Sequence, residues 1–299
     1  MDVAKLVTLT LDSLGMEQEL GMERSPALHR MALIAARAAI TSELWADPSS
    51  RRLLLPAALD HVAAHLHGRR ELAEAIGLVL EVVKLLKSGG DTEDDVITLA
   101  EKCIGPLGVA IVAEQELGDE TEEQELIPAS LVTALLGILE LLSPSHHLRL
   151  WRTDSSLLSR LLTVLSEVMA RPSCLPMDWL PLRLAAAIAI SSALQMAGDC
   201  LPHLIFDKQL WMSYYRLSVT YITSPLLGVQ EQGSNGSVIS LEPVEDLRLP
   251  LARHMVVVWS NCPEKIQLVP SLVGPLLEVT LIPQREVRIG LGGYYKVTL

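Results

Sequence analysis

Aromatic side chains are the scarcest large class in this sequence. Among 299 residues there are five Trp, five Tyr and a single Phe, or 4% of the chain, although 49% of all residues are apolar. That apolar fraction is far too high for a disordered chain. It is rich in Leu and Ala, and straight-chain residues lose little rotamer freedom in a helix. We therefore predict an all-α fold.

Basic residues are also in deficit, with 24 Lys and Arg against 36 Asp and Glu and a formal net charge of −12. Phosphates of nucleic acids and of anionic membranes are met by clustered Lys and Arg. The balance argues against a nucleic-acid partner and a membrane-surface role. No uninterrupted apolar run reaches about 18 residues, and the N-terminus lacks the pattern of a signal peptide. We expect a cytoplasmic protein without direct membrane insertion.

The four cysteines are far apart and form no CxxC pair, so they do not have the short spacing of metal ligands. We expect buried, reduced thiols. The sequence also lacks GxGxxG, GxxxxGK[ST], HExxH and GxSxG. The acidic stretches at 91–95 and 114–125 lack the ligand spacing of a calcium loop. We predict no catalytic residue, no metal site and no cofactor.

Histidines form the only cluster that resembles a ligand set. His61 and His65 are four residues apart and share one helix face, and His67 follows them. No Cys or carboxylate stands at helical spacing to complete a zinc site. We interpret the three as the solvent-facing edge of a helix. His146 and His147 follow Ser143-Pro144, and we assign them to a turn.

Apolar residues recur at intervals of three and four along almost the whole chain. Turn signals separate the helical stretches, and Gly68 is the expected left-handed cap of the second one. Short links between many helices predict an irregular α-solenoid of stacked helical pairs, of the armadillo, HEAT or tetratricopeptide (TPR) kind, although no fixed repeat period is present. A globular helical bundle is the alternative. The expected helices span 25–45, 53–68, 72–86, 92 onwards, 128–142, 154–170, 177–197, 207–223, 243–260 and 269–281.

Two segments interrupt the helical pattern. Residues 118–125 are acidic and poor in apolar side chains, and residues 230–240 are rich in Gly, Ser and Asn, so we expect mobile loops at both. We assign 1–288 to one helical-repeat region. Residues 289–299 contain three glycines within four positions, which would break a helix, so we predict a divergent, disordered tail.

The aromatic residues concentrate in the last third of the chain. Trp211, Tyr214 and Tyr215 lie on one predicted helix, and Trp259 lies on a later one. Aromatics of this kind anchor protein interfaces, so the helices could form a peptide-binding groove. Packing between neighbouring helices is the other interpretation. We take these four residues as interface or core anchors.

Several stretches resemble the dedicator-of-cytokinesis (DOCK) family. The resemblance is most specific in the last third, where Glu286-Val287-Arg288 extends it, and is looser before Trp151. It rests on Leu-His-Gly-Arg-Arg-Glu-Leu at 66–72, Pro-Met-Asp-Trp at 176–179, Asp-Lys-Gln-Leu-Trp-Met-Ser-Tyr-Tyr-Arg-Leu at 207–217, and Leu-Val-Pro-Ser-Leu-Val-Gly-Pro-Leu-Leu-Glu-Val-Thr-Leu-Ile-Pro at 268–283.

The resemblance implies a fragment of a guanine-nucleotide exchange factor for Rac and Cdc42 GTPases. The matched part is the helical region between a C2-like membrane-binding domain and the exchange domain, and no residue here matches the exchange domain. It implies a scaffold in small-GTPase signalling that is not an enzyme alone. Family partners are Rac and Cdc42 and, in some members, ELMO adaptors, bound through domains that this chain does not match. Family members are cytoplasmic and are recruited to the plasma membrane. The alternative is a peptide- or helix-binding interaction module.

Overall fold

The computed structural model describes residues 5, 26–89, 93–113, 122–171, 173–176, 178–224, 230–232, 238–240 and 242–279. Its contacts divide the chain into two compact units, residues 1–146 and 147–299. The first unit contains α2 (Pro26–Ile40), the short 3-10 helix η1 (Glu43–Trp45), α3 (Pro48–Gly68), α4 (Leu72–Ser88), α5 (Glu93–Ala113), α6 (Glu122–Leu141) and the start of α7 (Pro144–Thr153).

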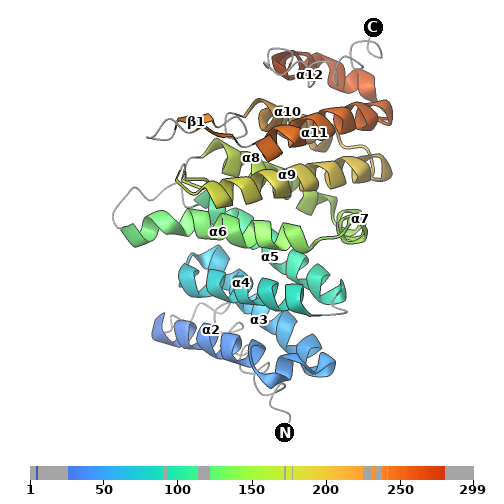
Figure 1. The fold of residues 1–299 in the computed structure, drawn as a ribbon. Helices are drawn as coiled ribbons and strands as arrows, with labels where there is room; N and C mark the ends of the chain where they lie inside the picture. The colour runs from blue at the N-terminus through green and yellow to red at the C-terminus, as the bar shows by residue number, and fades with distance from the viewer. Residues whose placement is uncertain are drawn as a thin grey trace. The chain divides into compact units, whose positions relative to one another are not determined.

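Alternate helices of the first unit form two layers. The helices α2, α4 and α6 follow one another in one layer, and α3 packs along α5 in the other (Figure 1). Neighbouring helices cover the side chains that lie between the two layers. Four of these side chains have no exposed surface, namely Leu55, Leu59, Val79 and Leu99. This arrangement is typical of helical-repeat proteins, in which each pair of helices is buried by its neighbours.

Residues at the ends of α3 explain where that helix begins and ends. The Asp47 carboxylate accepts hydrogen bonds from the Ser50 backbone N–H at 2.9 Å and the Ser50 hydroxyl at 2.7 Å, which caps the helix. Pro48 follows at the first helical position, where its missing N–H costs nothing. The left-handed residue after the helix is Arg69, with φ of 53°, and not the predicted Gly68. Gly68 is the last helical residue.

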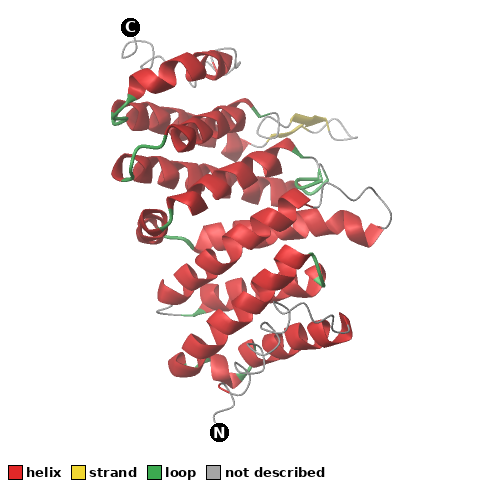
Figure 2. Cartoon of the chain, turned by 180° about the vertical axis from the view of Figure 1, so that it is seen from behind, coloured by secondary structure: helices red, strands yellow, loops and turns green. Residues whose placement is uncertain are grey.

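The second unit repeats the two-layer arrangement. In it, α9 packs along α11, and α10 packs against both α8 and α12 (Figures 1 and 2). Its elements are the rest of α7, α8 (Ser155–Ala170), α9 (Leu180–Cys200), the 3-10 helix η2 (Leu201–His203), α10 (Lys208–Thr223), β1 (Gln230–Gln232), β2 (Val238–Ser240), α11 (Glu242–Ser260) and α12 (Lys265–Val279). The all-α prediction and its stacked helices are confirmed.

Two details of the sequence interpretation need correction. His146 and His147 lie in the first turns of α7 and not in a turn between helices, because Pro144 opens that helix at its first position. The expected loop at 230–240 contains the two strands, which pair antiparallel with Gln230 opposite Ser240. Residues 118–121 of the other expected loop, and the whole predicted tail at 289–299, lie outside the described residues, and α6 begins at Glu122.

Among the residues that the structure describes, two helices are apolar and long enough to cross a membrane by length and composition. They are Glu93–Ala113 and the continuous stretch Leu180–His203, in which 67% and 56% of the tested residues are buried within the fold. A third candidate is the bent pair Leu126–Leu141 and Pro144–Thr153. A helix that contacts neighbours on more than one side of a stack needs an apolar surface wider than one stripe. Packing therefore accounts for the composition of α5, which contacts both α3 and α6.

Candidate functional site

The four predicted aromatic anchors lie together in the interior of the second unit. Trp211, Tyr214, Tyr215 and Trp259 are each at most 1% exposed. The ring of Tyr215 is central, because its centroid is 6.3 Å from Trp211, 5.0 Å from Tyr214 and 5.6 Å from Trp259. Tyr215 is stacked on Trp211 and meets Tyr214 and Trp259 edge-on, and both kinds of ring contact stabilise a core beyond the area they bury. The structure places these side chains between α10 and α11 and not on an exposed face.

Gly198 on α9 lies where neighbouring side chains leave no room for a Cβ atom. A Cβ atom there would lie 2.6 Å from Tyr214 Oη, 2.7 Å from His254 Cε1 and 2.8 Å from Val258 Cγ2. Burial raises the pKa of the Tyr214 hydroxyl, so this group stays neutral in the core. On the outer side of the contact, His254 Nε2 is 2.8 Å from Asp199 Oδ1. Three helices therefore meet closely at this glycine.

We predicted that three histidines of α3 form the solvent-facing edge of a helix, and this prediction is wrong for two of them. His61 and His65 are 3% and 0% exposed, and only His67 faces solvent. The Nε2 atoms of His61 and His65 are 3.2 Å apart, and His29 from α2 joins them, with its ring centroid 5.3 Å from that of His65. Burial lowers the pKa of His61 to about 4 and also lowers that of His65. Both rings are therefore neutral core residues near pH 7.

The four cysteines are free thiols, and all are buried, as predicted. Burial raises the pKa of Cys103 to about 12 and that of Cys200 to about 11. A thiol is nucleophilic as its thiolate, so these side chains are inert near neutral pH. Within the described ranges, no three His, Cys, Asp or Glu side chains are grouped so that they could hold a metal ion.

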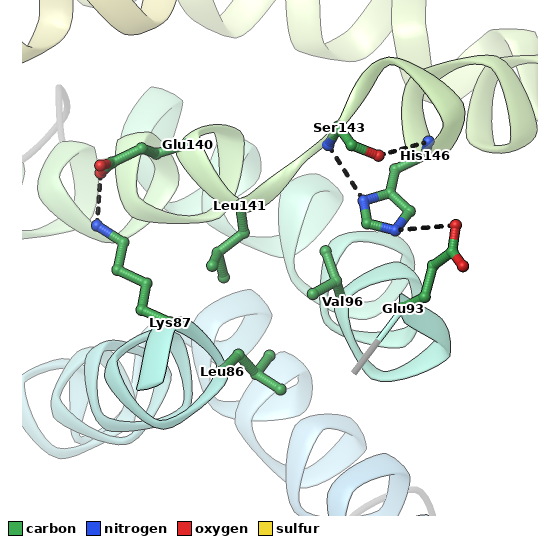
Figure 3. Close-up of a pocket in the computed structure, with 8 residues that line it drawn as sticks. All are labelled: Leu86, Lys87, Glu93, Val96, Glu140, Leu141, Ser143 and His146. Carbon is green, nitrogen blue, oxygen red and sulfur yellow. Dashed lines mark hydrogen bonds and ion pairs between the residues drawn. The ribbon is translucent and has the colours of Figure 1, made fainter. Parts of the chain in front are cut away.

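An open cavity of about 630 Å³ lies at the helix ends of the first unit (Figure 3). Two polar pairs flank it. Lys87 Nζ is 2.6 Å from Glu140 Oε2, and His146 Nε2 is 3.7 Å from Glu93 Oε1. Between them lie apolar side chains from three helices. The cavity is lined by Leu86 and Lys87 of α4, Glu93 and Val96 of α5, Glu140 and Leu141 of α6, and Ser143 and His146 at the start of α7.

A second cavity of about 580 Å³ shares Glu93 with the first. Its charged groups are already paired in part, because Arg51 Nε lies 2.6 Å from Asp95 Oδ2. The same guanidinium donates to the Trp45 carbonyl at 3.3 Å and lies 5.7 Å from the centre of the Trp45 ring. Arg51 therefore ties η1 to the first turn of α5.

Sequence reasoning missed both cavities. Lys87 and Glu140 are 53 residues apart, and no motif or spacing connects them. The cavities form where several helix ends meet, and that meeting depends on the stacking of the helices. The sequence had singled out His146, which it assigned to a turn, and Glu93, as part of the acidic stretch at 91–95, but it did not connect them.

The fold and its cavities define a class of protein. Two-layer stacks of helices, with aromatic side chains and thiols in the interior, are the architecture of a helical-repeat protein. The family model "Dedicator of cytokinesis (DOCK) TPR region" matches residues 1–291. The chain therefore belongs to the DOCK family through its TPR region.

Individual relatives agree with this assignment. The chain is 28% identical over 312 residues to "Dedicator of cytokinesis protein 4" of Mus musculus and 27% identical over 308 residues to "Dedicator of cytokinesis protein 3" of the same species. Each comparison covers 96% of this chain and 15% of the relative. The chain thus spans about one seventh of the length of these relatives.

Proposed function

We propose that this chain is the helical scaffold of a guanine-nucleotide exchange factor that acts on Rac and Cdc42-family GTPases, and that it has no exchange activity alone. The observation that carries the proposal is the family match over 1–291, which concerns the TPR region, together with a relative of which the comparison covers only 15%. The proposed role is to hold other parts of the protein in place. The two stacks of helices, each with a buried apolar interior, are suited to this role. We further propose a cytoplasmic protein that is recruited to the plasma membrane, with ELMO adaptors among the partners of the longer protein.

Release of a fluorescent guanine nucleotide from Rac and from Cdc42 tests the exchange part of this proposal. Residues 1–299 are added in tenfold excess to each loaded GTPase, with EDTA as the positive control because it removes the magnesium that holds the nucleotide. We expect release at the intrinsic rate. Acceleration that depends on the concentration of the chain would contradict the proposal.

A second candidate function is a peptide-binding interaction module. The observation that favours it is the open cavity of the first unit, where apolar side chains lie between polar pairs. The aromatic side chains of the second unit do not support it, because they are buried. A scaffold and a peptide-binding module are compatible in one helical-repeat protein.

A further inference from the structure

We draw no further inference here: the strongest candidate, the exposed apolar face that Ile266, Val273 and Leu277 form on α12, carries nothing because no feature of the described residues shows what covers it.

Discussion

At the scale of single residues, ring contacts and hydrogen bonds in the interior of the second unit indicate the role of its aromatic side chains. Tyr215 lies between Trp211, Tyr214 and Trp259, and its hydroxyl donates to the Met255 carbonyl at 3.5 Å. Tyr221 similarly donates to the Ala187 carbonyl at 2.8 Å and joins α10 to α9. Buried tyrosine hydroxyls generally find such partners. These contacts argue for a structural role of the cluster.

Trp211→Ala is the first test of that role. Removing a side chain that is 1% exposed leaves a cavity, and we expect the free energy of unfolding to fall by roughly 3–5 kcal/mol. Trp179→Ala is the matched control, because Trp179 is 40% exposed at the start of α9 and should cost much less. Urea denaturation of both variants provides the comparison. Equal losses, or a Trp211→Ala variant as stable as the parent, would mean that Trp211 is not a core residue.

Gly198→Ala tests the close approach of α9, α10 and α11. Because the new methyl would lie within 2.8 Å of three side-chain atoms, the helices must move apart, and we expect a loss of about 1–3 kcal/mol. At Gly77 on α4, the added methyl meets only the end of the Arg37 side chain at 3.6 Å. Gly77→Ala should therefore stabilise by about 0.5–1 kcal/mol through helix propensity. Thermal melting measures both, and changes of the same sign would contradict the packing described.

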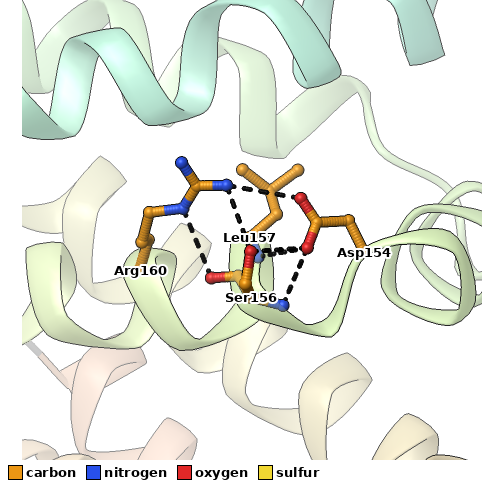
Figure 4. A network of polar contacts seen from close by, with 4 residues as sticks. All are labelled: Asp154, Ser156, Leu157 and Arg160. Atoms are coloured by element: carbon orange, nitrogen blue, oxygen red, sulfur yellow. Dashed lines mark hydrogen bonds and ion pairs between the residues drawn. The ribbon is translucent and has the colours of Figure 1, made fainter.

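At the scale of the element, short polar motifs fix where helices begin. Asp154 caps α8, because its Oδ1 accepts from the Ser156 backbone N–H at 2.9 Å and from the Leu157 backbone N–H at 3.2 Å (Figure 4). Arg160 Nη2 adds a contact to the other carboxylate oxygen at 3.3 Å. The hydrogen bond from the Ser156 hydroxyl is the main reason that the pKa of Asp154 is lowered.

Asp154→Ala should destabilise the second unit by about 0.5–2 kcal/mol, because two backbone N–H groups lose their acceptor. Asp154→Asn keeps a side-chain acceptor and should recover most of this loss. Asp178→Ala removes an exposed carboxylate that does not cap α9, whose cap position is Trp179. Urea denaturation should rank Asp154→Ala as the least stable of the three variants. A loss of the same size in Asp178→Ala would point to net charge as the cause.

The contact between α2 and α3 should weaken in mild acid. The pKa of His61 is about 4 in the folded state, against about 6.5 in an unfolded chain, and that of His65 is lowered as well. At a pH between the folded-state and unfolded-state pKa values, the unfolded chain binds more protons than the folded chain does. The free energy of unfolding therefore has its full value above about pH 6.5. Below that pH it falls by up to about 1.4 kcal/mol per pH unit for each histidine, and it stops falling below the folded-state pKa.

Hydrogen exchange measures this loss locally. After correction for intrinsic exchange rates, we expect amides of 54–66 in α3 to lose protection between pH 7.5 and pH 5.0. The groups that face the pair are the imidazole of His29 on α2 and the guanidinium of Arg70 after α3, and neither can compensate a new positive charge. Hydrogen bonds from the Ser50 and Ser156 hydroxyls lower the pKa of the capping carboxylates Asp47 and Asp154, so these groups do not account for a change in this window. His61→Gln should reduce the pH dependence, and exposed His67→Gln should not; the reverse result would refute this account.

The sequence predicted the positions of most helices but not all of the contacts between them. Periodic apolar residues located α4, α8 and α10 closely, because apolar side chains recur along each of them at helical spacing. The helix α7 was missed because Ser143-Pro144 signals a turn and a helix start equally well. His61 and His65 were assigned to solvent because only tertiary packing by α2 covers them. The cavity at Glu93 and His146 was unpredictable for the same reason, since it joins the ends of separate helices.

At the scale of the whole molecule, the chain is one region of a longer family architecture. Its family match covers 1–291, while the mouse relatives share only 15% of their length with it. The resemblance noted in the motifs of the last third predicted this family correctly. The described helices give each of the two units a buried core, and an open cavity lies at the helix ends of the first unit. The scaffold role that we propose for the chain predicts that it has no site that reshapes a GTPase.

The formation of a complex with a nucleotide-free GTPase tests this central claim most directly. An exchange factor that speeds nucleotide release does so by binding the nucleotide-free GTPase more tightly than the loaded form, and this coupling is reciprocal. Rac or Cdc42 is stripped of nucleotide with EDTA, mixed with residues 1–299, and separated by size-exclusion chromatography with light scattering. The account predicts that chain and GTPase elute separately. A stoichiometric complex that forms without nucleotide and dissociates on addition of GTP would contradict it.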